Sequence, residues 1–116
     1  MSIEKLSKKL YICYSKELCY PKVKDCWSDH NRYLGMCAIT SLVVNDYFGG
    51  KICKVYVNGI SHYFNLINNS IVDLTAKQFE NEIDYHDYKI IHRDSLMIED
   101  TKRRYYMLKK KLEEIK

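Results

Sequence analysis

Two short asparagine turns constrain this chain of 116 residues more than any other feature. "NG" at 58–59 and "NN" at 68–69 separate three apolar segments, "KICKVYV", "ISHYFNLI" and "SIVDLT". Asn-Gly is the strongest short signal for a β-hairpin, because a type I′ turn needs two consecutive residues with positive φ. Asn-Asn carries the same signal more weakly. The sequence therefore predicts an antiparallel meander of three strands.

Helices are predicted on both sides of this meander. Apolar side chains recur at helical spacing over 3–18 and over 36–48, and "GG" at 49–50 ends the second helix. Residues 76–85 are expected to form a short helical turn, and "YKIIH" is a candidate fourth strand. Residues 95–114 are expected to form a closing helix, whose inner side chains are Leu96, Met97, Tyr105, Leu108 and Leu112. The sequence thus predicts one α+β domain over residues 1–116.

Cysteine number and charge limit the class of protein. The five cysteines are an odd number, and the segment "MSIEKLSKKL" lacks the apolar core of a secretory signal, so we expect reduced thiols in the cytoplasm. No apolar run is long enough to span a membrane. Much of the net charge of +4 lies in "TKRRYYMLKKKLEEIK", where acidic residues alternate with basic ones. This alternation favours a solvated helix face over nucleic-acid binding.

The second hairpin brings two polar residues together. A two-residue loop at 68–69 pairs Phe64 with Asp73 and His62 with Thr75. Side chains alternate between the two faces of a strand, so His62 and Asp73 are predicted to be diagonal neighbours on one face. A three-residue loop would place them on opposite faces. With the shorter loop, the sequence predicts a hydrogen bond between imidazole and carboxylate.

Cys37 lies in the first turn of the apolar helix that must pack against this sheet, and we expect this helix to dock on the face that carries His62 and Asp73. Free N–H groups and the helix dipole at that position favour a thiolate, and a neighbouring imidazole would favour it further. Cys37, His62 and Asp73 then suit the roles of nucleophile, base and orienting carboxylate. Each has a structural alternative: a core cysteine, and a half-buried histidine satisfied by its surroundings. Asp73 is harder to explain structurally, because an aspartate within an apolar strand needs a partner.

Three blocks of sequence point to a known family. "CWSDHNRYLGMCAITSLVVNDYFGG", "VNGISHYFNLI" and "IVDLTAKQF" resemble, in this order, the YunG-like family of small bacterial proteins. The resemblance implies a papain/NlpC-P60/transglutaminase-like core, with N-terminal helices packed on a meander of three to four strands and a closing C-terminal helix. It also implies a triad formed by Cys37, His62 and Asp73. Met36 replaces the glutamine that usually precedes the cysteine in that family.

Three further residues are candidates for contact with the substrate or with an oxyanion: Asn31, Met36 and Trp27. Asn31 lies six residues before Cys37, an offset comparable to that of the oxyanion-hole glutamine in papain-like enzymes. The alternative is that the Asn31 side chain only stabilises its own turn.

The leading hypothesis is a cysteine-dependent acyl-transfer enzyme that acts on a peptide or another small acyl or amide substrate. It would need no cofactor, and the sequence leaves hydrolysis and transfer to an amine both open. A catalytically inactive binding module on the same scaffold is the alternative. A zinc site formed by Cys19, Cys26, His30 and Cys37 is disfavoured, because their spacing contains no Cys-x-x-Cys pair.

Overall fold

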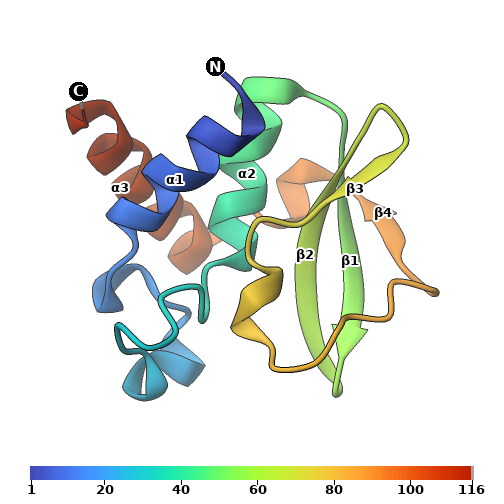
Figure 1. Ribbon diagram of the computed structural model, residues 1–116, viewed down its shortest axis with the longest axis horizontal. Coiled ribbons are helices and arrows are strands. Elements are labelled where there is room, and N and C mark those ends of the chain that lie inside the picture. The colour runs from blue at the N-terminus through green and yellow to red at the C-terminus, as the bar shows by residue number, and fades with distance from the viewer. Residues whose placement is uncertain (116) are drawn as a thin grey trace.

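The computed structural model describes residues 1–115 as an α+β arrangement of helices and one four-stranded antiparallel sheet (Figure 1). In chain order the elements are α1 (Ile3–Cys13), η1 (Lys16–Leu18), η2 (Pro21–Cys26), α2 (Cys37–Phe48), β1 (Lys51–Val57), β2 (Ile60–Ile67), β3 (Ser70–Val72), η3 (Ala76–Gln78), β4 (Lys89–Ile91), η4 (Arg93–Ser95) and α3 (Glu99–Glu114). The four η elements are short 3₁₀ helices.

Both asparagine turns are the two-residue loops that the sequence predicts. The φ angles are 53° and 79° at Asn58 and Gly59, and 51° and 64° at Asn68 and Asn69. The register follows from these loops, because Val57 pairs with Ile60 and Ile67 pairs with Ser70. The strand order is β3-β2-β1-β4, so the candidate fourth strand forms and pairs with β1 at the far edge of the meander.

β3 is shorter than the predicted segment "SIVDLT". It ends at Val72, and the next residue, Asp73, accepts a hydrogen bond from the backbone N–H of Thr75 through its own side chain (3.2 Å). An aspartate that bonds to the backbone two residues on turns the chain and competes with strand pairing. Asp73 therefore ends the strand instead of extending it.

α1 is also shorter than predicted, because it ends at Cys13 and not at residue 18. Tyr14 takes an extended conformation, and its hydroxyl bonds to Thr40 Oγ1 at 2.6 Å in the interior. The Arg32 guanidinium donates to the carbonyls of Tyr11, Ile12 and Tyr14, with the shortest distance 2.7 Å, to Tyr14. These contacts satisfy the free carbonyl groups at the helix end and fix the chain reversal there.

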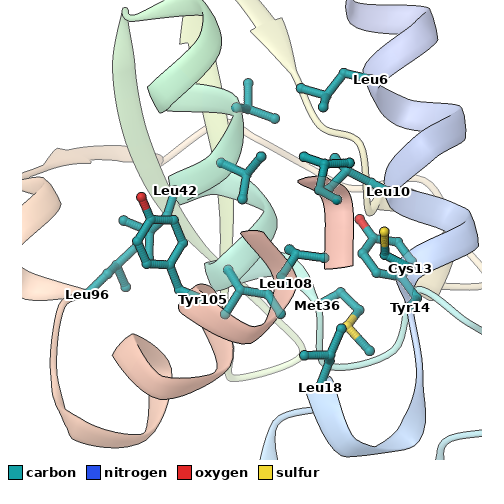
Figure 2. Packing of buried hydrophobic residues seen from close by; sticks show 14 of the residues in the cluster. Leu6, Leu10, Cys13, Tyr14, Leu18, Met36, Leu42, Leu96, Tyr105 and Leu108 are labelled. Carbon is teal, nitrogen blue, oxygen red and sulfur yellow. The ribbon is translucent and has the colours of Figure 1, made fainter. Parts of the chain in front are cut away.

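The helices form a layer in which α2 is central. Figure 1 shows α2 between the sheet on one side and α1 and α3 on the other. α1 packs against α3, whereas α2 packs against β1 and β2 and so covers the sheet. Figure 2 shows the main core between these helices, with Leu6 and Leu10 from α1, Leu42 from α2, and Tyr105 and Leu108 from α3. Four of the five predicted inner residues of the closing helix segment are buried, and Met97 is half-buried.

A smaller apolar cluster lies on the opposite face of the sheet. Cys53, Val55 and Phe64 are buried there under half-buried side chains of the segment that leads to β4, namely Ile83, Tyr85 and Tyr88. Within residues 1–115, no helix is both long and apolar enough to cross a membrane.

Candidate active site

The structure brings His62 and Asp73 together as the hairpin register predicts. His62 Nε2 lies 2.6 Å from Asp73 Oδ2, and both side chains are buried, with 0% and 4% of their surface exposed. A carboxylate only accepts hydrogen bonds, so Nε2–H is the donor and Nδ1 is left for another partner. The imidazole also stacks on Phe64 and meets the edge of Phe79, whose ring centroid is 5.0 Å away. The ring therefore has one defined orientation.

Asp73 is held by two further donors. The backbone N–H of Thr75 reaches Oδ1 at 3.2 Å, and the Tyr85 hydroxyl donates to Oδ2 at 2.8 Å. Hydrogen bonds to a carboxylate are stronger than those between neutral groups, and a buried carboxylate needs them. Burial and the Asp73 carboxylate in turn raise the pKa of the Tyr85 phenol, so this residue stays a donor over the physiological pH range.

Cys37 is the first residue of α2 and lies next to the imidazole. Burial alone lowers the pKa of His62, but the hydrogen bond with Asp73 and the adjacent Cys37 side chain raise it to about 9. Cys37 is half-buried. The N-cap residue Met36 makes no side-chain hydrogen bond to the first turn of α2. Backbone N–H groups of a first turn have no partner within the helix and can bind an anion.

One detail of the sequence prediction is wrong. α2 packs mainly on the face of the sheet where Asn65 donates to the Ser41 carbonyl at 3.0 Å, whereas alternation places His62 with Phe64 on the other face. β3 pairs only with Asn65–Ile67 of β2, so within residues 1–115 no strand covers the edge of β2 beside His62. Because β3 is short, His62 and the first residue of α2 are able to meet near this edge.

The loop before Cys37 is fixed by contacts with distant parts of the chain. Gly35 has a φ of +74° and accepts a hydrogen bond from Tyr20 N at 3.1 Å. Arg104 of α3, which is only 2% exposed, donates to the carbonyls of Leu18 and Gly35 at 3.0 and 3.4 Å. Asp100 balances its charge at 2.7 Å. α3 therefore helps to set the position at which α2 begins.

The structure places the other three candidate residues outside the triad. Met36 is fully buried in the helical core, close to Leu18 in Figure 2. Trp27 Nε1 donates to the Arg32 carbonyl at 3.1 Å, and the Arg32 guanidinium lies over its ring. Asn31 Nδ2 donates to the backbone carbonyl of Gln78 at 3.0 Å. Asn31 thus contacts Gln78, a neighbour of His62, through its side chain.

Sequence reasoning missed Gln78 and Tyr85. Gln78 Nε2 lies 3.4 Å from His62 Nδ1 and 3.3 Å from Thr75 Oγ1. The segment "DLTAKQF" contained a usable signal, since a turn immediately after an orienting aspartate brings its next polar side chain back to the same site. Tyr85 gave no such signal, because it reaches Asp73 through a loop of irregular conformation.

The remaining cysteines differ from Cys37 in exposure. Cys13, Cys19 and Cys53 are buried, and burial raises the pKa of each thiol, that of Cys19 to about 11. Cys26 is exposed. Among residues 1–115, no three histidine, cysteine or acidic side chains are grouped closely enough to hold a metal ion.

A surface groove of about 800 Å³ runs between α1 and the segment that follows Asp73. Its walls include Tyr11 and Ile12 from α1, Tyr33 from the loop before Cys37, and Leu74 and Lys77 from the segment after Asp73. Leu74 and Lys77 are the chain neighbours of Asp73 and Gln78. Two residues that line the groove are therefore next in sequence to Asp73 and Gln78, at the two ends of the turn.

The fold and the site define an α+β protein with a Cys-His-Asp arrangement between the start of a helix and an antiparallel sheet. A family model described as "YunG protein" matches residues 2–116, so the chain belongs to the YunG family. It is 39% identical over 59 residues to the "Uncharacterized protein YunG" of Bacillus subtilis (strain 168), which is 51% of either chain. The match thus spans about half of that relative. No solved structure matches the chain.

Proposed function

We propose that this protein is a cysteine-dependent acyl-transfer enzyme with Cys37 as nucleophile, His62 as general base and acid, and Asp73 as the orienting carboxylate. The observation that carries the proposal is the buried His62–Asp73 pair, with its second ring nitrogen free and Cys37 adjacent. A buried imidazole that is oriented by a carboxylate and lies next to a cysteine is the arrangement that activates a thiol. A cysteine at a helix start beside a strand histidine also favours a papain-like or transglutaminase-like core.

The chemistry proceeds in two steps. Because the pKa of His62 is raised to about 9, the proton shared with Cys37 lies on His62 Nδ1 before the substrate binds, and the Cys37 sulfur attacks the carbonyl carbon of an amide or ester. The leaving group departs with the proton from His62, and the acyl group remains on sulfur as a thioester. Water or an amine then resolves the thioester, with His62 again accepting a proton. The groove beside α1 is the proposed place for the rest of a peptide or small-molecule acyl substrate.

Alkylation by iodoacetamide, with mass mapping of each cysteine, tests this proposal. We expect Cys37 to react faster than the exposed Cys26 at about pH 6–7, where an ordinary thiol with a pKa of about 8.5 is mostly protonated. His62→Ala should reduce the Cys37 rate to that of Cys26, and Asp73→Asn should reduce it in part. His86→Ala is the matched control, because it also removes an imidazole but the His86 side chain is 82% exposed.

Equal and slow alkylation of Cys37 and Cys26 at this pH would contradict the proposal. That outcome would favour the alternative of a binding module that uses the same scaffold without catalysis. The buried Cys13, Cys19 and Cys53 serve as a check on folding, since they should become reactive only when the protein unfolds.

A further inference from the structure

The environment of Gln78 suggests a role beyond packing. Its side-chain amide lies 3.4 Å from His62 Nδ1, the ring nitrogen that does not bond to Asp73. Cys37 is a neighbour of the same imidazole, and its side chain raises the pKa of the ring. Gln78 and Cys37 thus share His62 as a neighbour. An N–H donor at such a position is able to stabilise the negative oxygen of a tetrahedral intermediate.

The backbone of Gln78 is fixed while its side chain is held only weakly. Gln78 N donates to the Thr75 carbonyl at 3.0 Å, and Asn31 Nδ2 donates to the Gln78 carbonyl at 3.0 Å. By contrast, the two contacts of Nε2, with His62 Nδ1 and Thr75 Oγ1, are long at 3.4 and 3.3 Å. Long hydrogen bonds are weak, so the amide is able to exchange them for a charged oxygen at little cost.

The side chain of Asn31 carries a second, independent sign of constraint. Its Nδ2 must face the Gln78 carbonyl, and this leaves Asn31 Oδ1 buried without a hydrogen-bond partner among the described residues. Buried oxygens without a partner are rare in folded proteins, and they occur preferentially where function constrains the arrangement. The orientation of Asn31 thus serves the position of Gln78 and not its own hydrogen bonding.

We propose that Gln78 is the side-chain oxyanion donor of this site and that Asn31 is its positioning residue. This inference rests on the proposed function, and it transfers the donor role from Asn31 to Gln78. When the Cys37 sulfur bonds to the carbonyl carbon, the electron pair of the C=O bond moves to oxygen. That oxygen then accepts hydrogen bonds from Gln78 Nε2 and from the backbone N–H of Cys37 at the start of α2. The oxyanion collapses and expels the leaving group, which takes the proton from His62.

Two reagents separate this role from any other effect of Gln78, because only one of the two reactions passes through an oxyanion. Iodoacetamide alkylates the thiolate by direct displacement and forms no oxyanion. p-Nitrophenyl acetate acetylates Cys37 through a tetrahedral oxyanion and releases p-nitrophenolate, which is followed by its colour. We expect Gln78→Ala to slow acetylation of Cys37 about 100-fold, as is usual when one oxyanion donor is removed, and to change alkylation less than about twofold. Asn31→Ala should slow acetylation by a smaller factor, also with unchanged alkylation.

Glu80→Gln is the matched control, because Glu80 is exposed two residues further along and should affect neither rate. If Gln78→Ala slows both reactions equally, the residue acts on His62 or Cys37 and the inference is overturned. It is also overturned if acetylation is unchanged. If the unmodified sequence shows neither preferential alkylation nor acetylation of Cys37, the proposed function itself fails, and this result differs from both of the others.

Discussion

Gly35→Ala is expected to lower the free energy of unfolding by about 2–5 kcal/mol, because two separate costs meet at this residue. The first is the backbone: φ is +74°, and a left-handed conformation costs an L-residue about 1–2 kcal/mol. The second is space. A Cβ at this position would lie 2.5 Å from Cys19 Sγ and 2.6 Å from Tyr20 N. Overpacking of an interior costs about 1–3 kcal/mol, and here Tyr20 N is a backbone atom already bonded to Gly35.

Gly59→Ala separates these two costs. Gly59 has a similar φ of +79°, but nothing lies within 4 Å of its added Cβ. It should therefore lose only the backbone part, about 1–2 kcal/mol. Urea unfolding of both variants measures the difference in their free energies of unfolding directly, provided that the slope of free energy against urea concentration is the same for both. Gly35→Ala should also slow alkylation of Cys37 relative to Cys26, because the loop that leads to the nucleophile must shift. If the two variants lose equal stability, the close approach at Gly35 does not matter and the reasoning is refuted.

Three other predictions follow from the same contacts. The pKa of His62 is raised from about 6.5 to about 9, which contributes about 3 kcal/mol of stability. This stability is present below about pH 6.5 and is lost as the pH rises through about 9. Urea unfolding across this range should show the loss, and an equal loss in Asp73→Asn would contradict the prediction. Tyr85→Phe removes one donor to the buried Asp73 and should cost about 1.5–3 kcal/mol. The pH at which the His62 contribution to stability is lost should move upward, because Asp73 then accepts more strongly from His62; an unchanged pH would show that Tyr85 does not act on the pair. Arg104→Met leaves the Leu18 carbonyl without its side-chain donor and the Gly35 carbonyl with Tyr20 N alone, and should cost about 2–4 kcal/mol in thermal or urea unfolding. Arg103→Met, at a 58% exposed side chain, should cost less than about 1 kcal/mol, and similar costs would count against the buried contact.

The parts of the fold that depend on local chemistry could be predicted from the sequence. Turns with positive φ at Asn58 and Asn68 fix the hairpin register, and this register correctly predicts that His62 and Asp73 are neighbours. The family resemblance is confirmed by the match over residues 2–116. Where a single residue both forms a turn and joins the site, as Asp73 does, periodicity predicts too long a strand, because the side-chain bond to Thr75 is invisible in a hydrophobic pattern.

The parts that depend on contacts between distant segments could not be predicted. Arg32 ends α1 through carbonyls that precede it by up to 21 positions, and no local pattern announces this contact. The face of the sheet on which α2 packs was predicted incorrectly. His62 lies on the opposite face and is close to the start of α2 because the short β3 leaves the edge of β2 open there, and the length of β3 is not visible in the hydrophobic pattern. Tyr85 reaches Asp73 through an irregular loop whose course depends on the cluster beneath the sheet. In each case the deciding interaction is tertiary and outweighs local preference.

The contact between Arg104 and the Gly35 loop has a consequence for the order in which the site is assembled. Its hydrogen bonds join residues 86 and 69 positions apart, whereas the His62–Asp73 bond joins residues only 11 apart. Contacts between close residues form early and those between distant residues form late, because a longer loop must be closed first. We therefore expect the imidazole–carboxylate pair to form early in folding, and the start of α2 to take its final position only when Arg104 docks. Cys37 would then reach its native surroundings last, in a chain that is already folded around it.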